Sequence, residues 1–245
     1  MDYFQQSITF DSPEGAVSVP LPEIDDWILY MVEVCINYGS QIGASIITLL
    51  VLLLLSKPEK RFSAIMIINC SSLIFNIIRT VTAAVYFSGP FAEIYAHYTG
   101  DHSKVTTSDI ATSVASGVFV LLMHVCIELS LYLQVRVVCV TLHEVYQRII
   151  LAVSGILALL SIAFRFVYVV ENDKVIVKQV SSVQLEWYGK MNTVFLAVSI
   201  TWFSIIFIGK LAIALHQRRK LGLGQFGPMQ VLLIMAFQTL IIPGS

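Results

Sequence analysis

Long apolar segments, separated by short polar ones, make up most of the chain after residue 34. An α-helix needs about 20 apolar residues to cross the hydrocarbon core of a membrane, because each residue adds about 1.5 Å along its axis. Five segments reach that length, and a shorter sixth follows near the end of the chain. They predict membrane spans at about residues 35–56, 64–87, 110–140, 149–170, 191–215 and 229–245.

Residues 1–34 are polar and acidic, which predicts a tail outside the membrane. Alternating polar and apolar residues at Ser7–Phe10 predict a short strand within it. Before Gln41 the chain has seven acids and no Lys or Arg, and most Lys and Arg residues fall in the loops on the other side. Because cytoplasmic loops retain cations, the N-terminus is predicted to be extracellular, with residues 35–245 as the transmembrane domain.

The composition is that of a multi-span membrane protein. Hydrophobic residues make up 57% of the chain and charged residues 13%, and the mean hydropathy is +0.80. Soluble domains carry about 25% charged residues. The histidines of the loop at residues 88–109 lack nearby thiols or clustered carboxylates, so the sequence predicts no metal site and no cofactor.

Polar side chains inside the predicted spans are informative, because they are costly in hydrocarbon unless they face protein or water. The third span carries Glu128, Ser130 and Gln134 within two helical turns, and the second span carries Asn69. Glu128 is either a functional group or a structural hydrogen-bond partner between helices, and the sequence leaves both open.

The first span contains Gly39 and Gly43, four positions apart. Such pairs of small residues let two helices approach closely. The two helices can belong to one chain or to two copies of it, and the pattern alone does not distinguish these two cases.

Several segments resemble one receptor family, the fungal α-factor-type mating pheromone receptors (class D G-protein-coupled receptors). The loop after the fifth span reads RRKLGLGQF at residues 218–226, and the sixth apolar segment continues with LLIM and QTLIIP. The third span reads IELSLYLQVRV, and the N-terminal tail contains SITFD. The loop and the third span are the most specific of these matches.

The resemblance implies an all-α membrane protein, a seven-transmembrane receptor bundle with five full spans and part of the sixth present. It implies a receptor of the plasma membrane that is not an enzyme. A peptide pheromone and a heterotrimeric G protein are the implied partners, with a second copy of the chain and membrane lipid, and without nucleic acid. Aromatic residues of the loop at residues 88–109 become a candidate wall of the pheromone site.

The resemblance also assigns roles to individual residues. Gly39 and Gly43 become the dimer contact, and Pro243 the activation hinge. An interior polar network of the resting state comprises Asn69, Glu128, Ser130 and Gln134. Coupling to the G protein falls to Arg218, Arg219, Leu221, Gly222, Gln225 and Phe226.

Two features depart from the family pattern. Gly224 stands where the family commonly has Lys, which removes one cation from the coupling loop. The sixth apolar segment stops at Ser245, short of a full span, so we expect an incomplete receptor with little independent signalling.

A multi-span secondary transporter or channel is the alternative. It would explain Arg79, Glu128 and Arg165 as charges of an ion pathway, and transporters usually show internal repeats. We find no such repeat. An intramembrane enzyme is disfavoured, because the spans show no pairing of nucleophile and base. The sequence favours the receptor.

Overall fold

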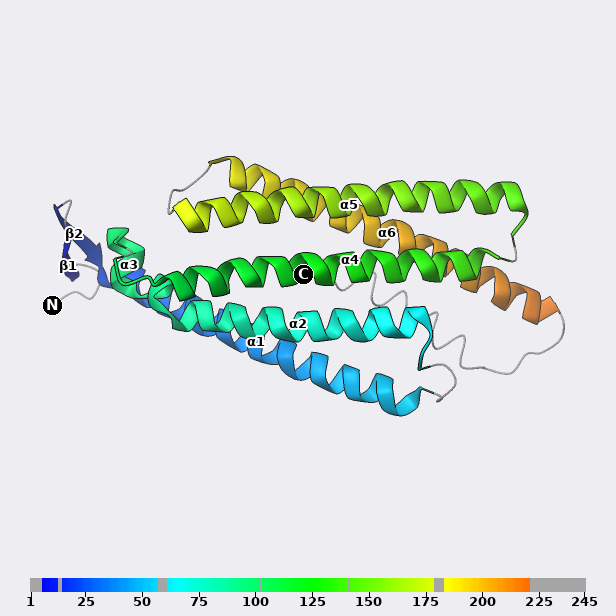
Figure 1. Cartoon of the computed structure of the whole chain (residues 1–245), viewed down its shortest axis with the longest axis horizontal. Helices are drawn as coiled ribbons and strands as arrows, with labels where there is room; N and C mark the ends of the chain where they lie inside the picture. Colours follow the sequence, from blue (N-terminus) through cyan, green and yellow to red (C-terminus); the bar gives the residue numbers. More distant parts are fainter. Residues whose placement is uncertain are drawn as a thin grey trace. The chain divides into compact units, whose positions relative to one another are not determined.

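The structure, a computed structural model, describes residues 6–12, 15–56, 61–101, 103–140, 142–178 and 183–220. Its long helices are α1 (Leu21–Leu55), α2 (Ala64–Ser88), α4 (Thr107–Cys139), α5 (Glu144–Lys178) and α6 (Val183–Lys220). In this part of the chain, these five helices are long and apolar enough to cross a membrane (Figure 1). The prediction of an all-α multi-span membrane protein is confirmed. The predicted sixth span, about residues 229–245, lies outside the described residues.

A β-hairpin precedes the first helix. Strand β1 (Ser7–Ser12) pairs antiparallel with β2 (Gly15–Pro20), with Ser7 opposite Pro20. The short strand predicted from the alternating residues is therefore present. Gly15 has φ +134°, a backbone conformation that only glycine adopts readily.

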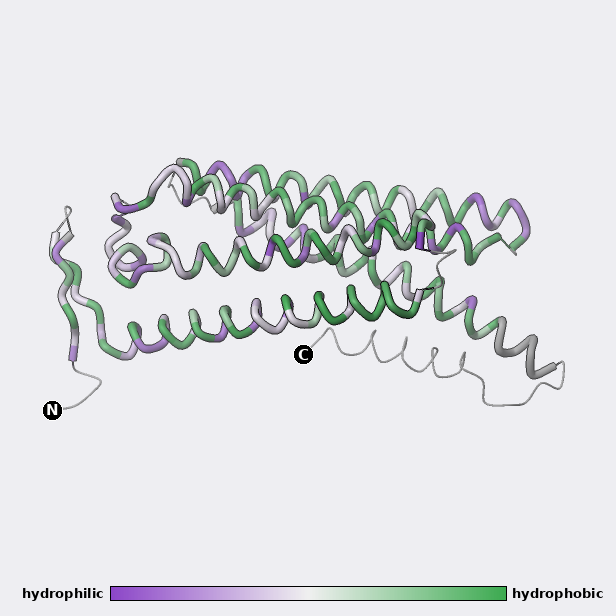
Figure 2. The backbone as a smooth tube through the Cα atoms, turned by 60° about the horizontal axis from the view of Figure 1, so that its bottom comes forward, coloured by the Kyte–Doolittle hydropathy of each residue, from purple (hydrophilic) through white to green (hydrophobic). Residues whose placement is uncertain are grey.

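Helix α1 begins at Leu21, well before the start of the predicted span at Cys35. Pro22 lies in the first turn, where its missing N–H costs no helical hydrogen bond, and Glu23 is favoured near the positive end of the helix dipole. Figure 2 shows polar residues mixed into this first part of α1 and an apolar stretch toward its other end. The helix therefore carries acidic and aromatic residues beyond the span itself.

The loop predicted at residues 88–109 also contains helical structure. It forms the short 3₁₀ helix η3 (Pro90–Ala92) and the helix α3 (Ile94–Thr99). Gly100 ends α3 in the left-handed conformation, with φ +69°, which is a common helix stop. These two short helices position the aromatic side chains of the loop.

The chain divides into two compact units. Unit 1 comprises Met1–Cys126 with Val169–Val183, and unit 2 comprises Ile127–Tyr168 with Gln184–Ser245.

Polar contacts join α1 to α2 in unit 1. The Asn76 amide donates to the Ser45 hydroxyl across 2.8 Å, and Arg79 Nη2 donates to Gln41 Oε1 across 2.8 Å. The Ser116 hydroxyl of α4 donates to the backbone carbonyl of Arg79. Such pairing is required where helices pack in hydrocarbon, because no water can satisfy polar groups there.

Unit 2 has a small apolar core made by three helices. Its buried residues are Val135, Cys139, Ala158 and Phe203. Nearby, Trp202 Nε1 of α6 donates to the Ser154 hydroxyl of α5 across 3.0 Å. The core and this hydrogen bond hold the later part of α4 together with α5 and α6.

Candidate functional site

The candidate site is built first by the N-terminal turns of α1. Glu23, Asp26, Trp27 and Tyr30 follow a spacing of three, four and seven positions. In a helix this spacing places all four side chains on one face. The sequence therefore puts two carboxylates and two aromatic rings side by side before the apolar part of α1 begins.

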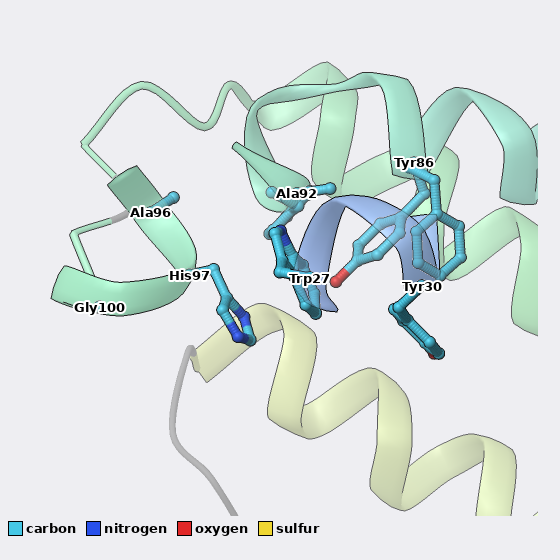
Figure 3. A pocket seen from close by; sticks show the side chains of 9 residues that line it. Trp27, Tyr30, Tyr86, Ala92, Ala96, His97 and Gly100 are labelled. Carbon is cyan, nitrogen blue, oxygen red and sulfur yellow. The ribbon is translucent and has the colours of Figure 1, made fainter. Parts of the chain in front are cut away.

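The end of α2 and the two short helices form the other walls of a cavity of about 490 Å³ (Figure 3). The cavity is lined by Trp27, Tyr30, Tyr86, Phe87, Phe91, Ala92, Ala96, His97 and Gly100. Its size is within the range of small-molecule sites, and aromatic linings are typical of such sites. The cavity can hold a few side chains of a peptide.

Ring stacking fixes these walls. The imidazole of His97 lies parallel to the indole of Trp27, with ring centroids 3.6 Å apart and planes 11° apart. Trp27 and Tyr30 stack at 5.6 Å, and Tyr86 and Phe91 stack at 5.0 Å. Stacked aromatic pairs add about 0.5–1.5 kcal/mol each beyond the area that they bury. The cavity is therefore formed by rings that hold one another in place.

A second hollow of about 480 Å³ adjoins the cavity on its acidic side. It shares Trp27, Tyr30 and His97 with the cavity, so the two are contiguous. Its other lining residues are Glu23, Asp26 and Tyr98. We call this second space the acidic hollow.

Two tyrosines of α3 attach this helix to the N-terminal segments. The Tyr98 hydroxyl donates to the backbone carbonyl of Glu23 across 2.7 Å, and the Tyr95 hydroxyl donates to that of Asp11 across 2.9 Å. Phe10 of the hairpin also meets Tyr95 edge to face, with centroids 6.2 Å apart. The site is thus assembled from segments far apart in the sequence.

Burial and charge set the protonation of the site. Burial lowers the pKa of His97 below its ordinary value, which favours the neutral imidazole. Burial, and then the carboxylates of Glu23 and Asp26, raise the pKa of Tyr98. After η3 and α3, Lys104 forms an exposed ion pair with Glu93, with 2.8 Å between Nζ and Oε2. A hydrogen bond to Glu93, with the charge of its carboxylate, raises the pKa of Lys104.

One polar atom of the site is left without a partner. The indole Nε1 of Trp27 is buried and has no hydrogen-bond acceptor among the described residues. An unpaired buried donor costs about 1–3 kcal/mol.

The predicted interior network falls partly in unit 2. Glu128 is fully buried and accepts a hydrogen bond from Ser199 of α6, with Oγ and Oε2 2.8 Å apart, and another from Ser161 of α5. Gln134 Nε2 donates to the Ser130 hydroxyl across 3.0 Å. The structure therefore adds Ser161 and Ser199, which the sequence analysis did not identify. The sequence around a serine in a membrane span does not indicate which residue its hydroxyl contacts.

Asn69 belongs to α2 and to unit 1. It is half-buried, and its backbone carbonyl accepts a hydrogen bond from the Ser72 hydroxyl across 2.9 Å. Its place in a network with Glu128 stays a prediction.

Gly39 and Gly43 lie on α1 with open space beside them. A Cβ atom added at either position would meet no atom of the described chain within 4 Å, apart from neighbouring residues and the helix's own backbone. The described part of the chain does not use this face for close packing around the two glycines. Their role as a dimer contact stays a prediction.

The predicted coupling residues lie at or beyond the end of α6. Arg218 and Arg219 belong to the last turn of this helix. Leu221, Gly222, Gln225, Phe226 and the predicted hinge Pro243 lie outside the described residues. Their roles stay predictions.

The sequence analysis identified only part of the cavity. It named aromatic residues of the loop at residues 88–109 as a candidate wall, and the structure places Phe91 and His97 in the lining. It missed Trp27, Tyr30 and Tyr86. The available signal was the spacing of aromatic and acidic residues from Glu23 to Tyr30, which is helical.

Comparison with known proteins gives a family match over the whole chain. A family model described as fungal pheromone mating factor STE2 GPCR matches residues 1–245. The chain is 27% identical over 238 residues to the pheromone alpha factor receptor of Lachancea kluyveri, covering 96% of the chain and 55% of that relative. It is 29% identical over 240 residues to the pheromone alpha factor receptor of Saccharomyces cerevisiae, covering 97% and 52%.

A third relative is the pheromone P-factor receptor of Schizosaccharomyces pombe, 27% identical over 249 residues, covering 98% of the chain and 70% of that relative. The chain spans about half the length of the two alpha factor receptors.

Proposed function

The chain belongs to the fungal STE2-type family of pheromone receptors, and from this premise we propose that it binds a secreted peptide pheromone in the cavity of unit 1. The single observation that carries the proposal is the aromatic lining formed by α1, α2, η3 and α3. Peptides bind protein surfaces through a few side chains that fill such pockets, and aromatic residues dominate the binding energy.

The membrane topology supports the same proposal. We infer that the hairpin end of the chain faces the outside of the plasma membrane, because this end carries acids and the cations cluster in the other loops. The cavity would then be open to a secreted ligand.

The signal would pass to a heterotrimeric G protein through the loop after α6. Arg218 and Arg219 at the end of α6 and the residues that follow supply the cations and the apolar group that the family resemblance assigns to coupling. We propose that the junction at Glu128 takes part in this step, because Glu128 links α4, α5 and α6 by hydrogen bonds within unit 2. Such a junction can hold one arrangement of three helices until a ligand favours another.

A second copy of the chain is the proposed partner of α1. The open face at Gly39 and Gly43 supports close contact between two helices in the membrane, because neither residue has a side chain to separate them. Membrane lipid would cover the remaining apolar surface.

The binding proposal can be tested with labelled peptides. Synthetic peptides of the α-factor type are titrated into the chain in lipid nanodiscs, and affinity is compared for the native chain, Tyr86→Ala and Phe91→Ala. Loss of a lining ring should weaken binding about tenfold or more. Tyr146→Ala is the control, because Tyr146 is 65% exposed on α5 and does not line the cavity. Absence of saturable binding, or equal loss in the control, would contradict the proposal.

A further inference from the structure

The acidic hollow carries chemistry that a general peptide site does not require. The carboxylates of Glu23 and Asp26 line it together with the rings of Trp27, Tyr30 and Tyr98. Within the described residues, neither carboxylate has an ion-pair partner, and Lys104 is engaged with Glu93. The hollow therefore keeps its negative charge.

We propose that the acidic hollow is the subsite for one cationic side chain, Lys or Arg, of the peptide ligand. This inference rests on the proposed function, because it names the chemistry of one residue of the same ligand. Carboxylates attract the cation, and aromatic rings strengthen this attraction when the cation lies against their faces. Arginine has the additional advantage of a planar guanidinium that stacks on rings.

Trp27 connects the acidic hollow to the larger cavity, because it lines both of them together with Tyr30 and His97. A cationic side chain in the hollow therefore lies next to the aromatic cavity in which we propose that other side chains of the same peptide bind.

Histidine 97 does not compete with the cation near neutral pH. The imidazole is stacked on Trp27 and shares the lining of the hollow. A neutral ring at this position leaves the carboxylates of Glu23 and Asp26 as the charges of the lining, so the subsite selects its ligand by charge.

The geometry also defines matched variants for the test. Glu23 and Asp26 are exposed at the helix surface, so Glu23→Gln with Asp26→Asn removes two charges without opening a space in the core. Glu33→Gln is the control, because Glu33 is an exposed acid of the same helix that does not line the hollow. Thermal unfolding of each variant checks that the fold is retained.

A first experiment needs no knowledge of the pheromone. Binding of N-acetyl-arginine amide and of its uncharged counterpart N-acetyl-citrulline amide is measured by saturation-transfer NMR on the chain in nanodiscs. The native chain and the Glu33→Gln control should prefer the arginine probe, and the double variant should lose that preference. Equal binding of both probes, or an unchanged preference in the double variant, overturns the subsite.

A second experiment uses any peptide that binds in the titration described above. Each Lys of the peptide is replaced by norleucine and each Arg by citrulline, one position at a time. One replacement should weaken binding to the native chain about tenfold and leave binding to the double variant unchanged. A peptide that binds but shows the same loss with both chains contradicts the subsite while leaving the proposed function intact. Absence of any peptide binding, with the arginine probe still bound, contradicts the proposed function instead.

Discussion

The imidazole of His97 lies 3.6 Å from the indole of Trp27, centroid to centroid, and joins the short helix α3 to the first turns of α1. His97 belongs to α3 and Trp27 to α1, which are far apart in the sequence. The same two helices are also joined by a hydrogen bond, because the Tyr98 hydroxyl donates to the backbone carbonyl of Glu23. A ligand in the cavity would therefore contact the same rings that attach the loop to the first helix.

Acidification should weaken peptide binding through His97. Burial lowers the pKa of His97, so the folded site favours the neutral imidazole over the protonated one. Between the ordinary pKa of 6.5 and the lower pKa of the folded site, the undocked loop binds a proton on His97 and the docked loop does not. Lowering the pH through this range therefore destabilises the docked loop. The protonated ring would also repel a cationic ligand. Affinity should therefore be constant above the ordinary value of 6.5 and decrease as pH falls below it.

The matched variant for this effect is His97→Gln, which cannot titrate. Its affinity should change less over the same range of pH. A pH dependence identical to that of the native chain would show that other groups are responsible.

Removing the tyrosine hydroxyls of α3 should loosen the loop. Tyr95→Phe and Tyr98→Phe each lose one hydrogen bond to a backbone carbonyl, which contributes about 0.5–1.5 kcal/mol. Amides of the hairpin and of α3 should exchange with solvent deuterium faster by about threefold to tenfold. Tyr146→Phe should leave this exchange unchanged. Unchanged exchange in the α3 variants would mean that the ring stacks alone hold the loop.

Glu128 should stabilise the three-helix junction of unit 2. Glu128→Ala leaves the hydroxyls of Ser161 and Ser199 without their buried acceptor and opens a space, at a cost of about 1–4 kcal/mol. Glu128→Gln keeps an oxygen acceptor of the same shape and should cost less. Thermal unfolding in detergent measures both. Leu129→Ala is the control, because Leu129 is 45% exposed on the same helix. Equal melting temperatures for Glu128→Ala and the control would contradict a stabilising junction.

Substitution at the two glycines of α1 should separate self-association from folding. No atom of the described chain lies within 4 Å of a Cβ at Gly39 or Gly43, beyond neighbouring residues and the helix's own backbone. Leu at both positions should therefore leave the melting temperature unchanged and reduce energy transfer between tagged copies in the membrane. Retained energy transfer would exclude this face as the dimer contact, and a large loss of stability would show that the face packs within the chain.

Hydropathy predicted the five spans because crossing a membrane requires only local composition and length. It could not assign Trp27 and Tyr30 to a helix, because the acids around them resemble those of a polar tail. The partners of Glu128 were hidden for a different reason. Ser199 is 71 positions away in the sequence, and a serine in a span looks the same whether it meets a carboxylate or its own helix backbone. Contacts of this kind come from packing, which the spacing of one segment does not encode.

The most direct test of the account is to map where a peptide binds. A peptide of the α-factor type that carries a photoreactive benzophenone side chain is bound to the chain in nanodiscs and cross-linked, and the attachment sites are identified by mass spectrometry. The account predicts attachment within residues 23–30 and 86–98, suppressed by excess unlabelled peptide and reduced in the Tyr86→Ala variant. Saturable cross-linking confined to other parts of the chain, and unaffected by Tyr86→Ala, would contradict it.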